Sequence, residues 1–149
     1  MTTATATMLE TTTTTAPTAR AEGAVVDAPR VILRLEGALV MIAGLAAYFA
    51  MGGSWGWLAA LFLLPDLSML GYLAGPRIGA LTYNAGHSHL APAMLAAAYA
   101  LGAPQWALFG ALIWFAHIGF DRMLGYGLKY DRFGATHLGT LGRGSLSPR

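Results

Sequence analysis

Hydrophobic residues dominate four consecutive stretches of this chain, and short turns separate them. The stretches cover roughly residues 33–51, 55–73, 78–101 and 104–124. Each is close to the ~20 residues that an α-helix rising ~1.5 Å per residue needs to cross ~30 Å of hydrocarbon. The segments between them are rich in glycine and proline, which favour turns. Short turns make successive helices antiparallel neighbours, so the pattern predicts an all-α integral membrane four-helix bundle.

Polar segments flank the hydrophobic part of the chain. Residues 1–29 are rich in threonine and alanine and lack apolar periodicity, so we expect a disordered tail. Residues 30–130 then form the membrane domain, and residues 131–149 form a cytoplasmic tail. The glycine-rich, aromatic segment 125–139 leaves two interpretations open. It is an interfacial anchor at headgroup depth, or it folds back as a lid that carries His137.

Composition and charge narrow the class of protein. Of the 149 residues, 56% are hydrophobic and only 11% are charged, which is typical of an integral membrane protein. Cysteine is absent, so disulfides and thiolate metal sites are excluded. The basic residues precede or begin the first stretch, lie in the turn 74–77, or end and follow the fourth stretch. The positive-inside rule therefore places both termini in the cytoplasm, and this distribution does not suggest a nucleic-acid partner.

Ionisable side chains interrupt three of the hydrophobic stretches. Asp66 lies in the second stretch, His87 and His89 lie in the third, and His117 and Asp121 lie in the fourth. Such groups cost a few kcal/mol each in hydrocarbon, so they are tolerated mainly where they face one another or a wet cavity. These residues are therefore the candidates for a functional site.

The helical rise predicts the depth of each candidate. Asp66 and His117 lie ~17 and ~18 Å below the outer face if their helices stand upright. His87 enters from the opposite side and lies ~14 Å above the inner face, which is almost the same level. Glu36 and Asp121 fall within ~7 Å of the cytoplasmic face and form a shallower second layer. Three helices are thus expected to bring ionisable groups to one plane.

Residues near His87 modify this arrangement. Asn84 lies three positions before His87 and shares its side of the helix, whereas His89 points away from it in a regular helix. Pro92 cannot donate a hydrogen bond to the carbonyl of Ser88. We therefore expect a kink that swings His89 partly inward.

One interpretation of these residues is a metal site inside the bundle, ligated by Asp66, His87, His117 and Asp121. Imidazole and carboxylate ligands without thiolate suit Zn, Mn or Fe, and an ion at this depth could activate water against a lipid-type substrate. The residues that would support the ligands or contact a phosphate headgroup are Glu36, Arg77, Asn84, His89, Arg122, Lys129 and His137. This interpretation makes the protein a metal-dependent membrane enzyme.

Two further interpretations need no metal. The polar groups could hydrogen-bond across helices and fix the packing of a non-catalytic scaffold or oligomerising protein, although each such bond is worth only about 0.6 kcal/mol on average. Alternatively, Asp66, His87 and His117 could relay protons or ions across the membrane. Four helices enclose a pathway poorly, so a relay would require a homo-oligomer.

Several short motifs give the chain a specific resemblance. They are Leu35-Glu36-Gly37, Leu64-Pro65-Asp66-Leu67-Ser68-Met69-Leu70-Gly71-Tyr72, Gly75-Pro76-Arg77, Tyr83-Asn84-Ala85-Gly86-His87-Ser88, His117-Ile118-Gly119-Phe120-Asp121-Arg122 and Gly125-Tyr126-Gly127-Leu128-Lys129-Tyr130. Over about residues 33–139 the chain resembles a small bacterial integral-membrane family known as domain of unknown function 4260. The resemblance implies a four-helix protein of the bacterial inner (cytoplasmic) membrane. It implies no activity, cofactor or partner beyond the lipid bilayer.

Overall fold

The protein folds into successive helices followed by a small β-hairpin. The structure, a computed structural model, describes residues 25, 27–130 and 135–140, so most of the predicted N-terminal tail lies outside the described residues. The elements are α1 (Asp27–Ala50), α2 (Trp55–Leu61), the 3-10 helix η1 (Leu64–Ala74), α3 (Pro76–Gly86), α4 (Leu90–Ala100), α5 (Gln105–Leu124), β1 (Ala135–Thr136) and β2 (Gly139–Thr140). The predicted all-helical class is confirmed, and the hairpin is a minor addition that the sequence pattern did not indicate.

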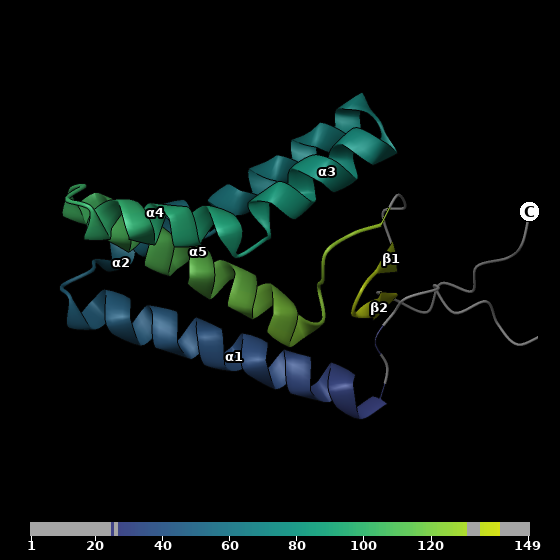
Figure 1. The fold of residues 1–149 in the computed structure, drawn as a ribbon, viewed down its shortest axis with the longest axis horizontal. Helices are drawn as coiled ribbons and strands as arrows, with labels where there is room; N and C mark the ends of the chain where they lie inside the picture. Colours follow the sequence, from purple (N-terminus) through teal and green to yellow (C-terminus); the bar gives the residue numbers. More distant parts are fainter. Residues whose placement is uncertain (1–24, 26, 131–134, 141–149) are drawn as a thin grey trace, which may run out of the picture.

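The helices form two pairs that diverge at one end (Figure 1). α1 packs along α5, α3 packs along η1, and α4 returns along α5. The start of α1, the turn between η1 and α3, and the end of α5 all lie at the same end of the molecule (Figure 1). This up-and-down order agrees with the predicted succession of antiparallel runs. The side of the membrane on which the termini lie stays a prediction.

Three segments among the described residues are long and apolar enough to cross a membrane: Ala28–Ala50, Trp55–Ala74 and Gln105–Leu124. The predicted third stretch is instead divided into α3 and α4, with residues 87–89 between them. Pro92 explains where the second part can begin, because it occupies the first turn of α4, where a backbone N–H has no helical acceptor. The expected kink is therefore a complete interruption of the helix.

The second span also changes character along its length. α2 ends at Leu61, and η1 continues as a 3-10 helix in which the Asp66 amide donates to the carbonyl of Leu63 at 3.1 Å. Pro65 contributes to this change, because it lacks the N–H that would continue the α-helical ladder. Long 3-10 segments are uncommon and often mark strain or function. Here the segment sets the direction in which Asp66 leaves the backbone.

Glycines allow α1 and α5 to touch along their backbones. A Cβ on Gly119 would lie 2.6 Å from both the carbonyl oxygen of Gly37 and the amide nitrogen of Met41. A Cβ on Gly44 would lie 3.0 Å from the carbonyl oxygen of Leu112. Small residues at a helix interface permit such close approach in membranes. The α1–α5 pair is thus the rigid support on which the opposite face of α5 presents its polar residues.

Candidate metal centre

His87 lies at the interruption between α3 and α4, as the residue that ends α3. Its ring stacks on the ring of Tyr83, with centroids 3.8 Å apart and an interplanar angle of 12°. Trp114 of α5 holds the same segment by donating its indole N–H to the carbonyl of Gly86 at 2.7 Å. Because the helix ends here, the His87 side chain is aimed by these local contacts rather than by a continuing helix.

Four side chains from three parts of the chain converge at this point. Asp66 comes from η1, His87 from the end of α3, and His117 and Asp121 from one face of α5. One potential ligand atom from each of the four lies within 4.8 Å of all the others. His87 Nε2 lies 3.2 Å from His117 Nε2, 3.3 Å from Asp66 Oδ1 and 3.4 Å from Asp121 Oδ2. His117 Nε2 lies 3.6 Å from Asp66 Oδ1 and 3.9 Å from Asp121 Oδ2.

The hydrogen bonds around His87 fix which of its ring nitrogens faces the others. His87 Nδ1 lies 3.0 Å from the backbone carbonyl oxygen of Tyr83, which can only accept, so Nδ1 carries a proton. In the neutral ring, Nε2 then presents a lone pair to two carboxylate oxygens and a second imidazole. This lone pair and the two carboxylate oxygens repel one another, and a cation at their centre would remove that repulsion. A carbonyl orienting the far nitrogen is also typical of metal-binding histidines.

The distances from the two histidine nitrogens to the other potential ligand atoms can be compared with those around a tetrahedral ion. With metal–ligand distances of ~2.1 Å, an ideal tetrahedron has edges of ~3.4 Å. The five distances involving the two histidines range from 3.2 to 3.9 Å and therefore bracket that value. The two histidines are therefore spaced from each other and from each carboxylate as ligands of a Zn²⁺-like ion are, and the two carboxylate oxygens lie within 4.8 Å of each other.

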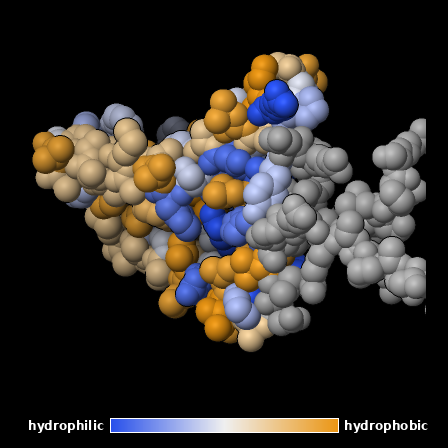
Figure 2. All heavy atoms as spheres, turned by 45° about the vertical axis from the view of Figure 1, so that its right-hand side comes forward, coloured by the Kyte–Doolittle hydropathy of each residue, from blue (hydrophilic) through white to orange (hydrophobic). Residues whose placement is uncertain are grey.

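The site is buried on the histidine side and open on the carboxylate side. His87 and His117 are almost fully buried, whereas 39% of the Asp66 side chain and 16% of the Asp121 side chain are exposed. Figure 2 shows hydrophilic residues gathered in a hollow on this face, framed by hydrophobic ones. An apolar cavity of about 160 Å³ adjoins the site, and its lining includes Pro65 and Trp114. The centre thus lies between a polar opening and an apolar cavity.

Lys129 lies in the segment after α5, and Asn84 of α3 ties this segment over the site. The Asn84 amide donates to the backbone carbonyl of Lys129 at 2.8 Å and accepts from its backbone N–H at 2.7 Å. Lys129 Nζ lies 4.0 Å from the centroid of the Tyr83 ring. Burial lowers the pKa of Lys129, and the nearby carboxylates of Asp121 and Asp66 partly offset that effect. A positive charge is therefore held close to the two carboxylates.

Tyr83 joins this cover to the cluster itself. Its hydroxyl lies 3.3 Å from Asp121 Oδ2 and donates to it. The ring thereby contacts His87 by stacking, Asp121 by a hydrogen bond and Lys129 through its π face. It orients side chains on both sides of the site, which is a supporting role rather than that of a ligand.

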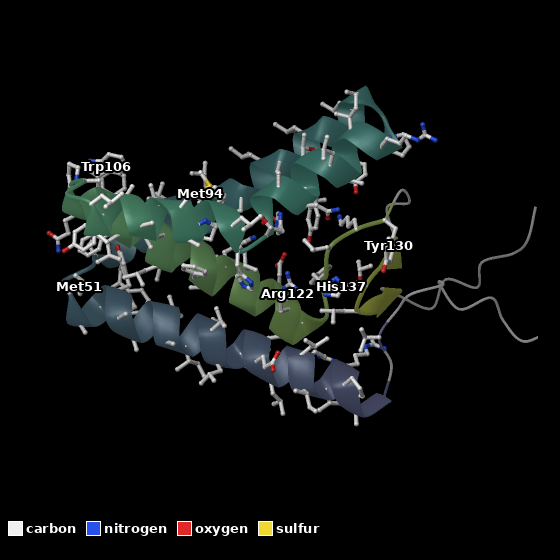
Figure 3. All side chains as sticks on the ribbon, viewed as in Figure 1. Met51, Met94, Trp106, Arg122, Tyr130 and His137 are labelled. Atoms are coloured by element: carbon white, nitrogen blue, oxygen red, sulfur yellow. The ribbon has the colours of Figure 1, made fainter. Side chains whose placement is uncertain are left out.

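His137 folds back onto the end of α5. The Leu128 amide donates to His137 Nδ1 at 2.8 Å, and His137 Nε2 lies 3.1 Å from Arg122 Nη1. Figure 3 shows Arg122 and His137 side by side at this end of the helix. Of the two interpretations of this segment, the fold-back that carries His137 agrees with these contacts.

Three other candidate residues lie apart from the cluster. Glu36 and Arg77 are exposed on α1 and at the start of α3. His89 is also exposed, and its ring packs on Phe115 rather than turning inward, because the helix breaks before it. Asp121 does not form a shallower layer with Glu36 but joins His87 and His117 directly. The depth estimate separated Asp121 from the others because it treated the helices as upright and His87 as part of a continuous one.

Trp114 supports the site but was not among the candidates from the sequence. It lies three positions before His117 and therefore shares its side of α5. That spacing was the available signal, but the acceptor on Gly86 exists only because α3 ends there.

Comparison with known proteins identifies a family. No curated protein and no solved structure matches the chain. The family model described as domain of unknown function (DUF4260) matches residues 30–141, which include the four clustered residues and the segment that covers them. The chain therefore belongs to the DUF4260 family.

Proposed function

We propose that this protein is a metal-dependent membrane enzyme in which Asp66, His87, His117 and Asp121 bind a divalent ion. The observation that carries the proposal is the convergence of their four ligand atoms within 4.8 Å of one another. The neutral His87 ring also supports the proposal, because the lone pair on its Nε2 faces two carboxylates. Nitrogen and oxygen ligands without thiolate favour Zn, Mn or Fe.

The substrate that best suits this setting is a lipid-type molecule. The ionisable cluster lies among apolar helices, and the adjoining cavity is lined by residues of α2, η1, α4 and α5 such as Leu61, Pro65, Leu95 and Trp114. A hydrocarbon chain is the natural occupant of such an apolar space in a membrane. Its polar end would then reach the centre near Pro65 and Trp114, which lie beside Asp66 and His117.

The reaction class that these groups support is hydrolysis of an ester or phosphoester. A divalent ion supplies Lewis acidity and lowers the pKa of water towards neutrality. Asp66 is the most exposed of the four proposed ligands, so water can enter the site beside it. A carboxylate there can take the proton of the attacking water, and that proton then leaves with the alcohol released when the ester bond breaks.

Elemental analysis of the full-length protein purified in detergent tests the proposal. We expect about one metal ion per chain in the wild type and a loss of at least tenfold in Asp66→Ala and His117→Ala. His89→Ala is the matched control, because His89 lies outside the cluster, and it should retain its metal. Metal absent from folded wild-type protein would contradict the proposal. A proton-flux assay in liposomes would then separate a relay from a scaffold built on the same polar contacts.

A further inference from the structure

The side chains of Arg122 and His137 face each other with two hydrogen-bond donors, which cannot bond to each other. The Leu128 N–H donates to His137 Nδ1 at 2.8 Å, so Nδ1 must present a lone pair. The proton of the neutral ring is therefore on Nε2, which makes Nε2 a donor. Arg122 Nη1 is also a donor, and it lies only 3.1 Å from His137 Nε2. Two donors at this distance require a shared acceptor.

The surrounding charges specify that acceptor as an anion. The base of the Arg122 side chain packs against α1, but its guanidinium interacts electrostatically with the Tyr83 hydroxyl and the Asp121 carboxylate of the candidate metal centre. Lys129 adds a second positive charge over the Tyr83 ring, which is hydrogen-bonded to Asp121. A divalent ion would balance the charges of Asp66 and Asp121, and the two basic side chains would then leave this end of the site positive. Positive sites of this kind concentrate anionic ligands.

Local structure holds the two donors in place. The Leu128 and His137 backbones pair, since the His137 amide also donates to the Leu128 carbonyl at 3.1 Å. Gly127 makes room for the ring, because a Cβ there would lie 2.6 Å from His137 Nδ1. On the other side, the Arg122 Cβ lies against Gly37 of α1, where a Cβ on the glycine would be only 2.6 Å away. The His137 ring and the base of the Arg122 side chain are therefore positioned before any ligand arrives.

We propose that Arg122 and His137 form a binding site for a phosphoryl group, which would be the anionic part of the substrate of the neighbouring centre. This inference rests on the proposed function for the identity of the substrate, but not for the existence of the anion site. A phosphoryl group offers several acceptor oxygens, so one oxygen can bridge Nη1 and Nε2 while another remains available to the centre. Arginine is well suited to phosphate because of its planar set of donors.

Calorimetric titration of the full-length protein in a neutral detergent tests this site. The ligands are inorganic phosphate, dihexanoyl phosphatidic acid and dihexanoylglycerol, which lacks the phosphoryl group. We expect phosphatidic acid to bind at least ~tenfold more tightly than dihexanoylglycerol, and Arg122→Gln and His137→Phe each to lose roughly tenfold or more of that affinity. Arg77→Gln is the matched control, because Arg77 is exposed at the start of α3, and it should bind as the wild type does.

The arms of the experiment distinguish the source of the phosphoryl group. Tighter binding of phosphatidic acid than of inorganic phosphate identifies a lipid headgroup, and equal binding of the two identifies a free phosphate site. Equal binding of phosphatidic acid and dihexanoylglycerol would overturn the proposal, as would unchanged affinity in Arg122→Gln and His137→Phe. Metal content is measured on the same samples. A variant that retains its metal but no longer binds phosphate locates the effect at the anion site. Wild-type protein that holds no metal but binds phosphate contradicts the proposed enzyme and leaves the anion site standing.

A second measurement does not depend on how the variants fold. In wild-type protein with ¹⁵N-labelled histidine, we expect the His137 ring to show a protonated Nε2 and an unprotonated Nδ1. Phosphate should shift the Nε2 resonance. A ring with Nδ1 protonated would let Nε2 accept from Arg122, and this result would overturn the proposal.

Discussion

The two faces of α5 show two different ways of joining helices. On one face, Gly119 brings the backbone of α5 against α1, and a single added carbon would collide with main-chain atoms. On the other face, His117 and Asp121 meet side chains from η1 and α3, which diverge from α5 (Figure 1). Residues 117 and 121 share one side of a helix and residue 119 lies opposite, so one short segment serves both purposes. Close backbone contact provides rigidity, and the divergence provides room for polar side chains.

Gly119→Leu should have the largest effect, because it acts on the rigid face. The new side chain would push against Gly37 and Met41 backbone atoms that cannot move away separately from α1. We expect a loss of roughly 3 kcal/mol or more in the free energy of unfolding, measured by denaturant titration in mixed micelles. Gly56→Leu is the control, since a Cβ at Gly56 meets nothing within 4 Å, and it should be nearly neutral. Equal stabilities for the two variants would show that α1 and α5 are not in close contact.

Asn84→Ala should have a moderate effect that is confined to the polar face. The substitution removes both hydrogen bonds to the Lys129 backbone and detaches the segment that covers the site. We expect a loss of about 2 kcal/mol and faster hydrogen exchange in residues 125–130, measured by mass spectrometry. Ser88→Ala is the control, because the Ser88 hydroxyl donates to the nearby carbonyl of Ala85. Exchange that speeds up equally in α1 would mean that the two faces are not independent.

Acidification should have the smallest effect, again on the polar face alone. Burial and the charge of Arg122 lower the pKa of His137 below its ordinary value of 6.5, although the Leu128 backbone partly offsets this. As the pH falls through 6.5, the unfolded segment takes up a proton that the folded segment resists, so the folded state becomes less stable. We expect the protection factor of the Leu128 amide, which corrects the exchange rate for the intrinsic effect of pH, to fall below pH 6.5. His137→Phe should abolish this pH dependence, and its persistence in that variant would assign it to another group.

Much of the architecture follows from residue order alone. The lengths of the hydrophobic stretches and the turns between them predict an all-helical membrane protein, because the thickness of a bilayer and the rise of a helix are fixed quantities. The same two quantities place Asp66, His87 and His117 at similar depth. The i, i+4 spacing of His117 and Asp121 puts both on one face of α5. These conclusions depend only on distances measured along a chain.

Tertiary structure decided the rest. The break after Gly86 turns His87 inward and leaves His89 outside, and only packing against Trp114 and Tyr83 determines that orientation. Asp121 joins the cluster because α3 ends beside it. His137 reaches Arg122 because the Leu128 backbone hydrogen-bonds to the backbone and the ring of His137. The sequence by itself determines that Asp66, His87 and His117 lie at similar depth. Which groups meet, Asp121 included, depends on helix breaks and crossings, because these arise from contacts between distant parts of the chain.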